Sequence, residues 1–299
     1  MCECLERKGG KNVCCRDRVF ILERQCLVKI CCYAIQDKVP MNSFYKYCPI
    51  YSHENLKEEH SLINLFKNQV SFSRRKNFND LFDSKVHISI PSRERVRRTY
   101  QKLSGHSKRT FKQLYMGKNA NDNFDELVSG IEKILDNYLF YCVTDDPINN
   151  LMWSHYSNSH NGFCIEWDSS SMSPEKVSYQ DSLPTLDLLE LIESNFGLRT
   201  KEEITSQAWI ALRIKLKEWK YESEYRINLN NKDHNLIVKD LGRLALVKYQ
   251  PEWIKSIIFG YRMPKETREY IRKNMPCDIL FQEVLISKNG NALELQKMS

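Results

Sequence analysis

Hydrophobic residues recur along the chain with two spacings, one typical of helices and one typical of strands. The clearest helical spacing lies at residues 124–135, where apolar side chains follow the i, i+3, i+4, i+7 pattern of an amphipathic helix. Capping residues, apolar stripes and proline positions predict further helices at residues 52–68, 146–156, 184–195, 200–216 and 264–273.

Short apolar or alternating runs predict strands between these helices, at residues 44–47, 70–73, 138–143, 163–167, 221–229, 254–259 and 279–286. No internal repeat is present, and regular β-α-β units are too few for a doubly wound sheet. The sequence therefore predicts one compact α+β domain, with a mixed, mainly antiparallel central sheet flanked by helices.

Composition narrows the class of protein. Of the 299 residues, 41% are hydrophobic and 28% are charged, which is typical of a globular chain and excludes a disordered one. No apolar run reaches the roughly 18–20 residues that a membrane-spanning helix needs, so no membrane partner is expected. Nothing in the sequence predicts an oligomeric state.

The cysteines divide the chain in two. Seven of the eleven lie in residues 1–40, at spacings that match no zinc-binding C-x2-C pair, so we expect a poorly ordered Cys-rich extension there. The remaining four are widely spaced among apolar neighbours, as buried free thiols are, which predicts a reduced, cytoplasmic protein. Residues 41–299 then form the folded domain.

The net charge of +7 conceals a strongly basic segment at residues 74–118, which has a net charge of +10. The segment is predicted to be a helical insertion within the domain. It is interpreted either as a nucleic-acid-binding surface or as a solvated charged insertion. On the first interpretation the side chains that bind nucleic acid are Arg93, Arg95, Arg97, Arg98, Lys108 and Arg109.

An alternating run at residues 221–229 places charged groups on one face of a predicted strand. Glu222, Glu224 and Arg226 share that face, while the opposite face is largely apolar. Two neighbouring carboxylates can divide the work of a reaction, one binding a hydroxyl and one transferring a proton, and the arginine keeps one of them ionised. The alternative is a solvated strand face.

Two further groups of residues are candidates for a ligand site. Trp153, His155 and Tyr156 lie within two helical turns and suit a flat, polar ring, although they also suit an ordinary core. Tyr45 and Lys46 on the first strand, Ser73 on the second, and Asn79 and Asp80 in the following turn could line a pocket. No metal is expected here.

Together these motifs resemble a widespread, mostly bacterial domain family without an assigned function. The resemblance is carried by Y-K-Y at the first strand, F-S and F-N-D after it, M-W-S-H-Y with H-N-G, and W-x-Y-E-x-E-x-R. It covers the chain from about Met41 onward and includes a strand-Gly-helix end at residues 257–273.

A more distant likeness, to ADP-ribosyltransferases of the kind found in bacterial toxin and phage-defence systems, implies an activity. The E-x-E of residues 222–224 is similar to the motif of some members. The resemblance implies that NAD is the cosubstrate, that Glu224 is catalytic and that Glu222 assists it. It further implies that Tyr45 or Lys46 contacts NAD and that Ser71 or Ser73 braces the site.

Two other function classes fit the sequence. Asp80, Asp83, Glu222 and Glu224 could supply oxygen ligands to Mg²⁺ in a metal-dependent nuclease or other hydrolase. A non-enzymatic, nucleic-acid-binding regulatory module would instead depend on residues 74–118 alone. Convergence of Tyr45, Asn79, Trp153, His155 and Glu224 on one cleft would favour an enzyme.

Overall fold

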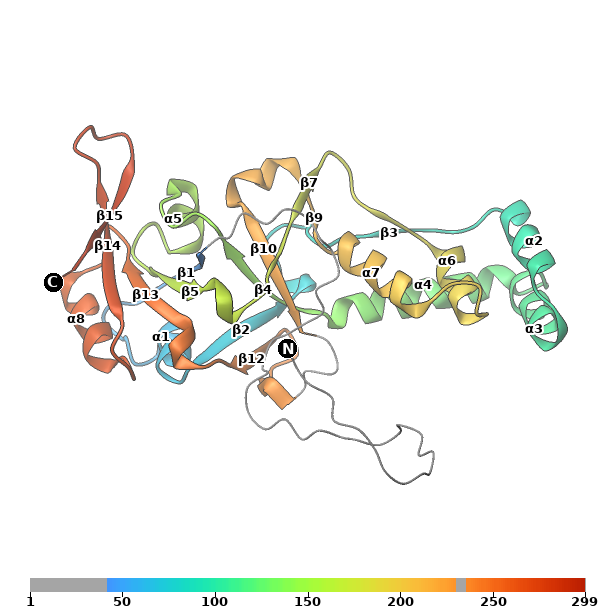
Figure 1. The fold of residues 1–299 in the computed structure, drawn as a ribbon, viewed down its shortest axis with the longest axis horizontal. Coiled ribbons are helices and arrows are strands. Elements are labelled where there is room, and N and C mark those ends of the chain that lie inside the picture. Colours follow the sequence, from blue (N-terminus) through green and yellow to red (C-terminus); the bar gives the residue numbers. More distant parts are fainter. Residues whose placement is uncertain (1–41, 230–234, 299) are drawn as a thin grey trace, which may run out of the picture.

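A mixed sheet forms the body of the molecule, and the computed structural model describes residues 42–229 and 235–298 (Figure 1). The predicted α+β class and mainly antiparallel sheet are confirmed. The predicted extension, residues 1–40, lies outside the described residues. The main sheet runs in the order β11-β12-β2-β4-β1-β5-β13-β14-β15, and β10, flanked by β6, also pairs with β4.

The strands and helices have the following bounds. The main sheet contains β1 (Ser43–Cys48), β2 (Gln69–Arg74), β4 (Leu139–Thr144), β5 (Phe163–Asp168), β6 (Glu175–Lys176), β10 (Glu224–Leu229), β11 (Ile237–Asp240), β12 (Leu244–Lys248), β13 (Ile254–Phe259), β14 (Leu280–Ile286) and β15 (Leu293–Lys297). Two small parallel pairs join β3 (His87–Ser89) to β8 (Thr185–Asp187) and β7 (Ser178–Gln180) to β9 (Ile214–Leu216). The α-helices are α1 (His60–Phe66), α2 (Arg93–Lys102), α3 (Gly105–Tyr115), α4 (Ala120–Asn137), α5 (Asn150–Tyr156), α6 (Leu188–Asn195), α7 (Lys201–Ala211) and α8 (Lys265–Asn274).

The sheet forks at β4. One edge of β4 pairs with β10 along its whole length. The other edge pairs with β1 only at Thr144, and with β2 only at Leu139 and Phe140. β1 and β2 thus pair with opposite ends of this edge and diverge from each other. On this edge, residues 141–143 of β4 pair with neither strand.

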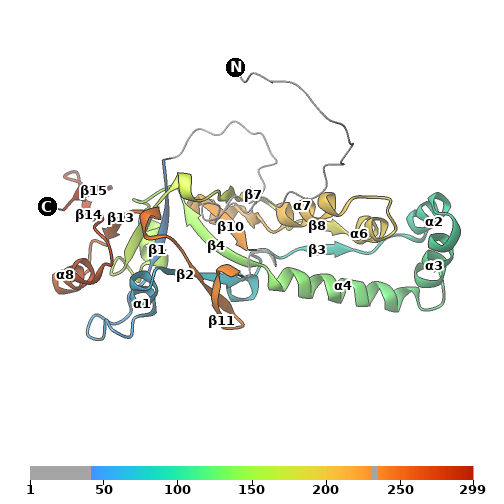
Figure 2. The ribbon, with the colours of Figure 1, turned by 60° about the horizontal axis from the view of Figure 1, so that its bottom comes forward.

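Five helices project from one end of the sheet as a helical lobe, formed by α2, α3, α4, α6 and α7 (Figures 1 and 2). The lobe has its own hydrophobic cluster, in which Phe111, Tyr115 and Phe124 pack with Leu188 and Ile192. Of the basic segment 74–118, only residues 93–102 and 105–115 are α-helical and belong to this lobe, which residues 120–137 and 188–211 complete; Arg74 ends β2, and residues 87–89 form β3. This division follows from long-range packing that local patterns do not reveal.

Three predicted helices begin later than expected. The helix predicted at 52–68 starts only at His60, because the buried Glu59 carboxylate accepts the backbone N–H groups of Tyr51 and Ser52 and holds them in a turn. The helix predicted from Asp146 starts at Asn150, with Asn149 as its N-cap. The helix predicted from residue 184 starts at Leu188, because residues 185–187 pair with β3.

The capping box predicted at Thr200 and Glu203 is confirmed at the start of α7. In the described part of the chain no helix is long and apolar enough to cross a bilayer. Four cysteines in that part are free thiols, at positions 48, 142, 164 and 277.

Candidate functional site

A cavity of about 360 Å³ lies at the fork of the sheet. β1 and β2 contribute two sides and β4 contributes the back. The segment 77–83, α5, β9, η3 (Lys217–Glu222) and β10 complete the wall. Its volume falls within the range of small-molecule sites, about 300–1,000 Å³. Lys46 lines the cavity, and its ammonium group donates at 2.9 Å to the carbonyl oxygen of Cys142, which pairs with β10 but with neither β1 nor β2.

Aromatic rings form much of the cavity wall. The lining includes Tyr45, Tyr47, Phe78, Phe140 and Tyr156, together with the imidazole of His155. Tyr47 is fixed because its hydroxyl donates to the Asp146 carbonyl oxygen at 2.8 Å. Burial raises the pKa of Tyr45 to about 12, and the nearby Glu166 carboxylate adds to the shift. Such a wall suits a flat ligand ring.

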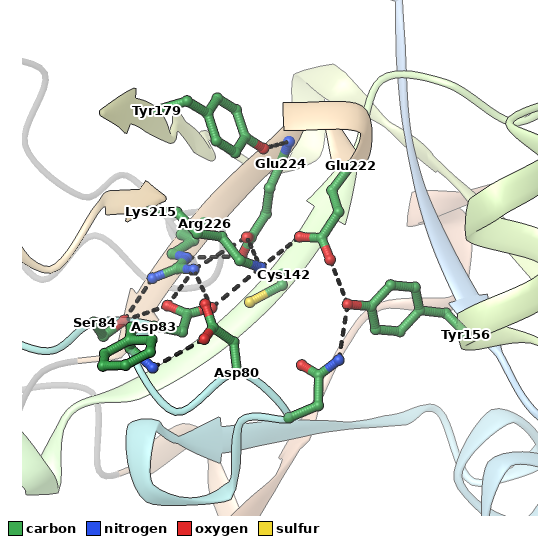
Figure 3. Close-up of polar contacts among 12 residues, drawn as sticks. Asp80, Asp83, Ser84, Cys142, Tyr156, Tyr179, Lys215, Glu222, Glu224 and Arg226 are labelled. Atoms are coloured by element: carbon green, nitrogen blue, oxygen red, sulfur yellow. Dashed lines mark hydrogen bonds and ion pairs between the residues drawn. The ribbon is translucent and has the colours of Figure 1, made fainter. Parts of the chain in front are cut away.

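Five buried charges form an ion cluster, defined here as Asp83, Glu222, Glu224, Lys215 and Arg226 (Figure 3). The fully buried Arg226 guanidinium donates to both oxygens of Glu224, at 2.7 and 3.0 Å, and to both oxygens of Asp83, at 2.7 and 2.8 Å. Its remaining N–H groups reach the Ser84 hydroxyl at 2.6 Å and the Leu212 carbonyl oxygen at 2.7 Å.

Lys215, on β9, is the second cation of the cluster. Its ammonium nitrogen lies 3.2 Å from a Glu224 oxygen and 3.2 Å from an Asp83 oxygen, and it also donates to Glu222. Its side chain is 3% exposed, and the ammonium group lies 4.9 Å from the centre of the Trp219 ring. With all five groups ionised, three carboxylates face two cations, so the cluster carries one net negative charge.

The two glutamates of the cluster have opposite pKa shifts. Burial raises the pKa of Glu222, and the neighbouring Glu224 carboxylate adds to this, while Lys215 opposes it. Burial also acts to raise the pKa of Glu224, but the charges of Arg226 and Lys215 outweigh it and lower the pKa of Glu224 well below its usual range. A pair of carboxylates with pKa values driven apart is typical of separate acid–base roles.

A chain of hydrogen bonds connects Glu222 to the rim of the cavity. The Tyr156 hydroxyl donates to Glu222, and the exposed Asn79 amide donates to the Tyr156 oxygen at 3.2 Å. Burial, together with the Glu222 charge, holds the pKa of Tyr156 well above its usual value, so Tyr156 remains a hydrogen-bond donor. Glu222 is therefore the carboxylate of the ion cluster that this chain of hydrogen bonds connects to the rim of the cavity.

The structure brings most of the predicted site residues together. Eight of the eleven candidate catalytic and ligand-binding residues line the cavity: Tyr45, Lys46, Ser73, Asn79, His155, Tyr156, Glu222 and Glu224. They come from β1, β2, the following turn, α5, η3 and β10, so their convergence depends on the tertiary fold.

Three candidates lie elsewhere. Trp153 is fully buried, and its indole N–H donates to the Pro147 carbonyl oxygen at 2.8 Å, because it faces the core while His155 and Tyr156 face the cavity. Arg226 lies behind Glu224, in the ion cluster. Asp80 accepts the backbone N–H of Phe82, and its second oxygen is buried with no hydrogen-bond partner among the described residues.

The predicted strand at residues 221–229 needs a correction. Strand β10 begins at Glu224, Glu222 ends the 3₁₀ helix η3, and Ser223 between them has a left-handed φ of 45°. The charged face is also buried rather than solvated, since Glu222, Glu224 and Arg226 are 3%, 5% and 0% exposed. The alternative of a solvated strand face is therefore wrong.

Sequence reasoning missed Lys215 altogether, considered Asp83 only as a metal ligand, and missed Tyr179, whose hydroxyl oxygen accepts the Glu224 backbone N–H at 2.8 Å. The one signal for Lys215 is a lysine between two aliphatic residues in I-K-L. Among the described residues, no three His, Cys, Asp or Glu side chains are grouped so as to hold a metal.

The six predicted nucleic-acid-binding residues are separate from the cavity. Arg93, Arg95, Arg97 and Arg98 lie on α2, and Lys108 and Arg109 lie on α3. Both helices are at the end of the helical lobe farthest from the sheet (Figure 1).

Comparison with known families gives one match. The model of a family described as "Protein of unknown function (DUF2971)" matches residues 152–227, from α5 to β10. The matched range includes His155, Tyr156, Glu222 and Glu224, and it is consistent with the predicted likeness to a family without an assigned function. No curated protein and no solved structure is significantly similar to the chain.

Proposed function

We propose that the cavity binds NAD and cleaves its nicotinamide–ribose bond, passing ADP-ribose to an acceptor or to water. The observation that carries the proposal is the pair Glu222 and Glu224, with opposite pKa shifts, at the wall of an aromatic-lined cavity. The distant likeness of the E-x-E motif to ADP-ribosyltransferases agrees with this assignment. The acceptor we propose is nucleic acid.

The charge of the cavity supports a cationic ring as the ligand. The ion cluster has one net negative charge when all its members are ionised, and aromatic faces attract cations. The nicotinamide ring of NAD is positively charged before cleavage and neutral after it. The cavity therefore favours the bound substrate ring and releases the product ring more readily.

The reaction assigned to Glu224 is electrostatic stabilisation. The bond between the nicotinamide nitrogen and ribose C1′ breaks, its electron pair leaves with nicotinamide, and positive charge develops on the ribose ring. Glu224 is ionised because Arg226 and Lys215 hold its pKa low, so it can stabilise that charge. Arg226 and Lys215 act as positioning residues for Glu224.

Glu222 is assigned the role of general base. It accepts the proton of the attacking water or acceptor hydroxyl while the oxygen bonds to C1′, which balances the step. Because its pKa is raised from the ordinary value, it is a stronger base than a free glutamate. Tyr156 orients it. Lys46, the lining cation outside the ion cluster, is assigned to pair with a phosphate of NAD.

The test is an assay of nicotinamide release and ADP-ribose transfer from labelled NAD. Glu224→Gln should lower the rate by about 10²- to 10³-fold, as expected for loss of a transition-state electrostatic contact. Glu222→Gln should remove the acidic limb of the pH–rate profile. Glu218→Gln, an exposed residue of the same 3₁₀ helix, is the matched control and should equal the wild type.

Because Glu224 is buried, a melting curve must accompany each variant. A folded Glu224→Gln protein as active as the wild type would overturn the assignment, as would a wild-type protein that neither binds nor cleaves NAD. Hydrolysis of nucleic acid that depends on Mg²⁺ would instead support the metal-dependent alternative.

A further inference from the structure

We infer that the tip of the helical lobe, α2 and α3 with the following loop to Lys118, binds the phosphate backbone of duplex nucleic acid. Residues 93–118 contain nine Lys and Arg and a single acidic residue, Glu94. This inference is independent of NAD chemistry, because α2 and α3 lie at the end of the lobe farthest from β1, β2 and β4 (Figure 2), the strands that line the cavity.

The structure narrows the basic surface to the tip. Arg74, Arg75 and Lys76 belong to the same basic segment, but they pair with Asp240, Glu132 and Asp136 beside the sheet. At the other boundary, α4 begins with exposed acidic residues at positions 122, 125 and 126. Between the two groups, residues 77–92 contain Lys85 but also Asp80 and Asp83, so the remaining excess of positive charge is confined to residues 93–118.

Most cations of the tip have no ion-pair partner among the described residues. Arg95 pairs with Asp187, Arg98 with Glu94, and Lys102 lies 3.9 Å from Glu193. The other six form no ion pair within the described residues, and all but the half-buried Lys108 are exposed: Arg93, Arg97, Lys108, Arg109, Lys112 and Lys118. Unpaired cations can displace counterions from a phosphate backbone, and that release favours binding.

The tip presents these charges on a folded scaffold. Val96 of α2 and Phe111 and Tyr115 of α3 are buried in the lobe's cluster against α6, and Ser92 caps α2. The charges are thus held in fixed relation to one another. The segment is therefore a folded part of the lobe and not a charged tail.

The aromatic residues indicate which feature of nucleic acid is bound. Proteins that bind single strands stack bases on exposed aromatic rings. In residues 93–118, Phe111 and Tyr115 are buried, and Tyr100 is half-buried with the Lys108 ammonium 4.8 Å from its ring. The tip thus has no exposed Phe, Tyr or Trp ring for stacking, and its one exposed ring is the imidazole of His106. It therefore suits the phosphates of a duplex and reads no sequence.

The test is fluorescence anisotropy with a mixed-sequence duplex, measured without NAD. If the tip makes three to six phosphate contacts, a plot of the logarithm of the association constant against the logarithm of the salt concentration should have a slope of about −3 to −5. The triple variant Arg97→Glu, Arg109→Glu and Lys112→Glu should bind at least about tenfold more weakly and show a shallower slope.

The matched control reverses three exposed lysines, Lys57 and Lys67 on either side of α1 and Lys273 on α8. Both helices lie away from the helical lobe (Figure 1), so this variant should bind within about threefold of the wild type. Equal loss in both triple variants would overturn the assignment to the tip. Absence of duplex binding at low salt, a slope near zero, or tighter binding of polyglutamate than of the duplex would overturn the inference altogether.

Discussion

Replacing Arg226 with methionine tests how the ion cluster behind the cavity is held together. Arg226 has no exposed surface and makes two hydrogen bonds to each of Glu224 and Asp83. Methionine has a similar length and no charge, so Arg226→Met removes the guanidinium with little change in volume. Glu224 and Asp83 would then share Lys215 as their only nearby cation.

The expected loss of stability is large. Removing one partner of a buried ion pair costs about 3–5 kcal/mol, because the opposite charge stays buried without compensation. In a chain of this size, 1 kcal/mol shifts the melting temperature by about 2–4 °C, so we expect a decrease of roughly 6–20 °C. Loss of the Ser84 and Leu212 contacts acts in the same direction.

The loss should depend on pH. In the wild type the pKa of Glu224 is lowered on folding, so its contribution to stability is complete above the unfolded pKa and decreases as pH falls through the folded pKa. In Arg226→Met, burial is opposed by one cation instead of two, so the pKa of Glu224 rises. The folded variant then binds protons at higher pH than the folded wild type, and the difference in stability narrows as pH falls from 7 towards 4.

Urea unfolding followed by tryptophan fluorescence at pH 7 and near pH 4.5 measures both effects. The control is Arg74→Met, which removes a two-bond contact to the half-exposed Asp240 and should cost less than about 1 kcal/mol. If Arg226→Met costs less than about 1 kcal/mol at pH 7, or the same at both pH values, the ion cluster does not hold this part of the fold together.

Two further predictions concern the backbone around the cavity. A Cβ atom at Gly162 would lie 2.1 Å from the Cys48 carbonyl oxygen, so Gly162→Ala should unfold at a much lower urea concentration. The control Gly130→Ala, in open space on α4, should gain about 0.5–1 kcal/mol of stability. Equal urea midpoints for the two variants would contradict this. Lys46→Met leaves the Cys142 carbonyl oxygen at the fork without its hydrogen-bond donor and should lower the free energy of unfolding by about 1–3 kcal/mol. An unchanged urea midpoint would show that water replaces the lysine.

Local patterns predicted much of the sheet correctly, because its strands are short apolar runs with turns at their ends. β4 and β13 are such runs, and both formed within one or two residues of the predicted bounds. Helix starts were predicted less well. Asp146 looked like an N-cap, but its carboxylate accepts the Ile148 N–H in a turn, and Asn149 caps α5 instead.

The candidate site was predictable where one segment supplied the chemistry. Glu222 and Glu224 stand out as E-x-E, and both line the cavity although the strand does not include Glu222. Asp83 and Lys215 could not be assigned their roles from the sequence. Asp83 reaches Arg226 from a loop 143 residues away, and Lys215 reaches Glu224 and Asp83 from β9, which pairs with β7 outside the main sheet. A single sequence does not specify which distant charges will meet.

Glu222 distinguishes a functional cluster from a purely structural one. It has a raised pKa, it lies beside Glu224, and it is the third carboxylate facing only two cations, so its ionised form disfavours folding at neutral pH. Glu222→Gln keeps the shape and can still hydrogen-bond to Tyr156. It should therefore leave stability at pH 7 equal to or above that of the wild type, while it lowers the rate of NAD cleavage and removes the acidic limb of the pH–rate profile. Glu224→Gln should lower stability, since it removes the charge that Arg226 and Lys215 compensate. A Glu222→Gln protein that loses more than about 2 kcal/mol would show that this carboxylate serves the fold rather than the cavity.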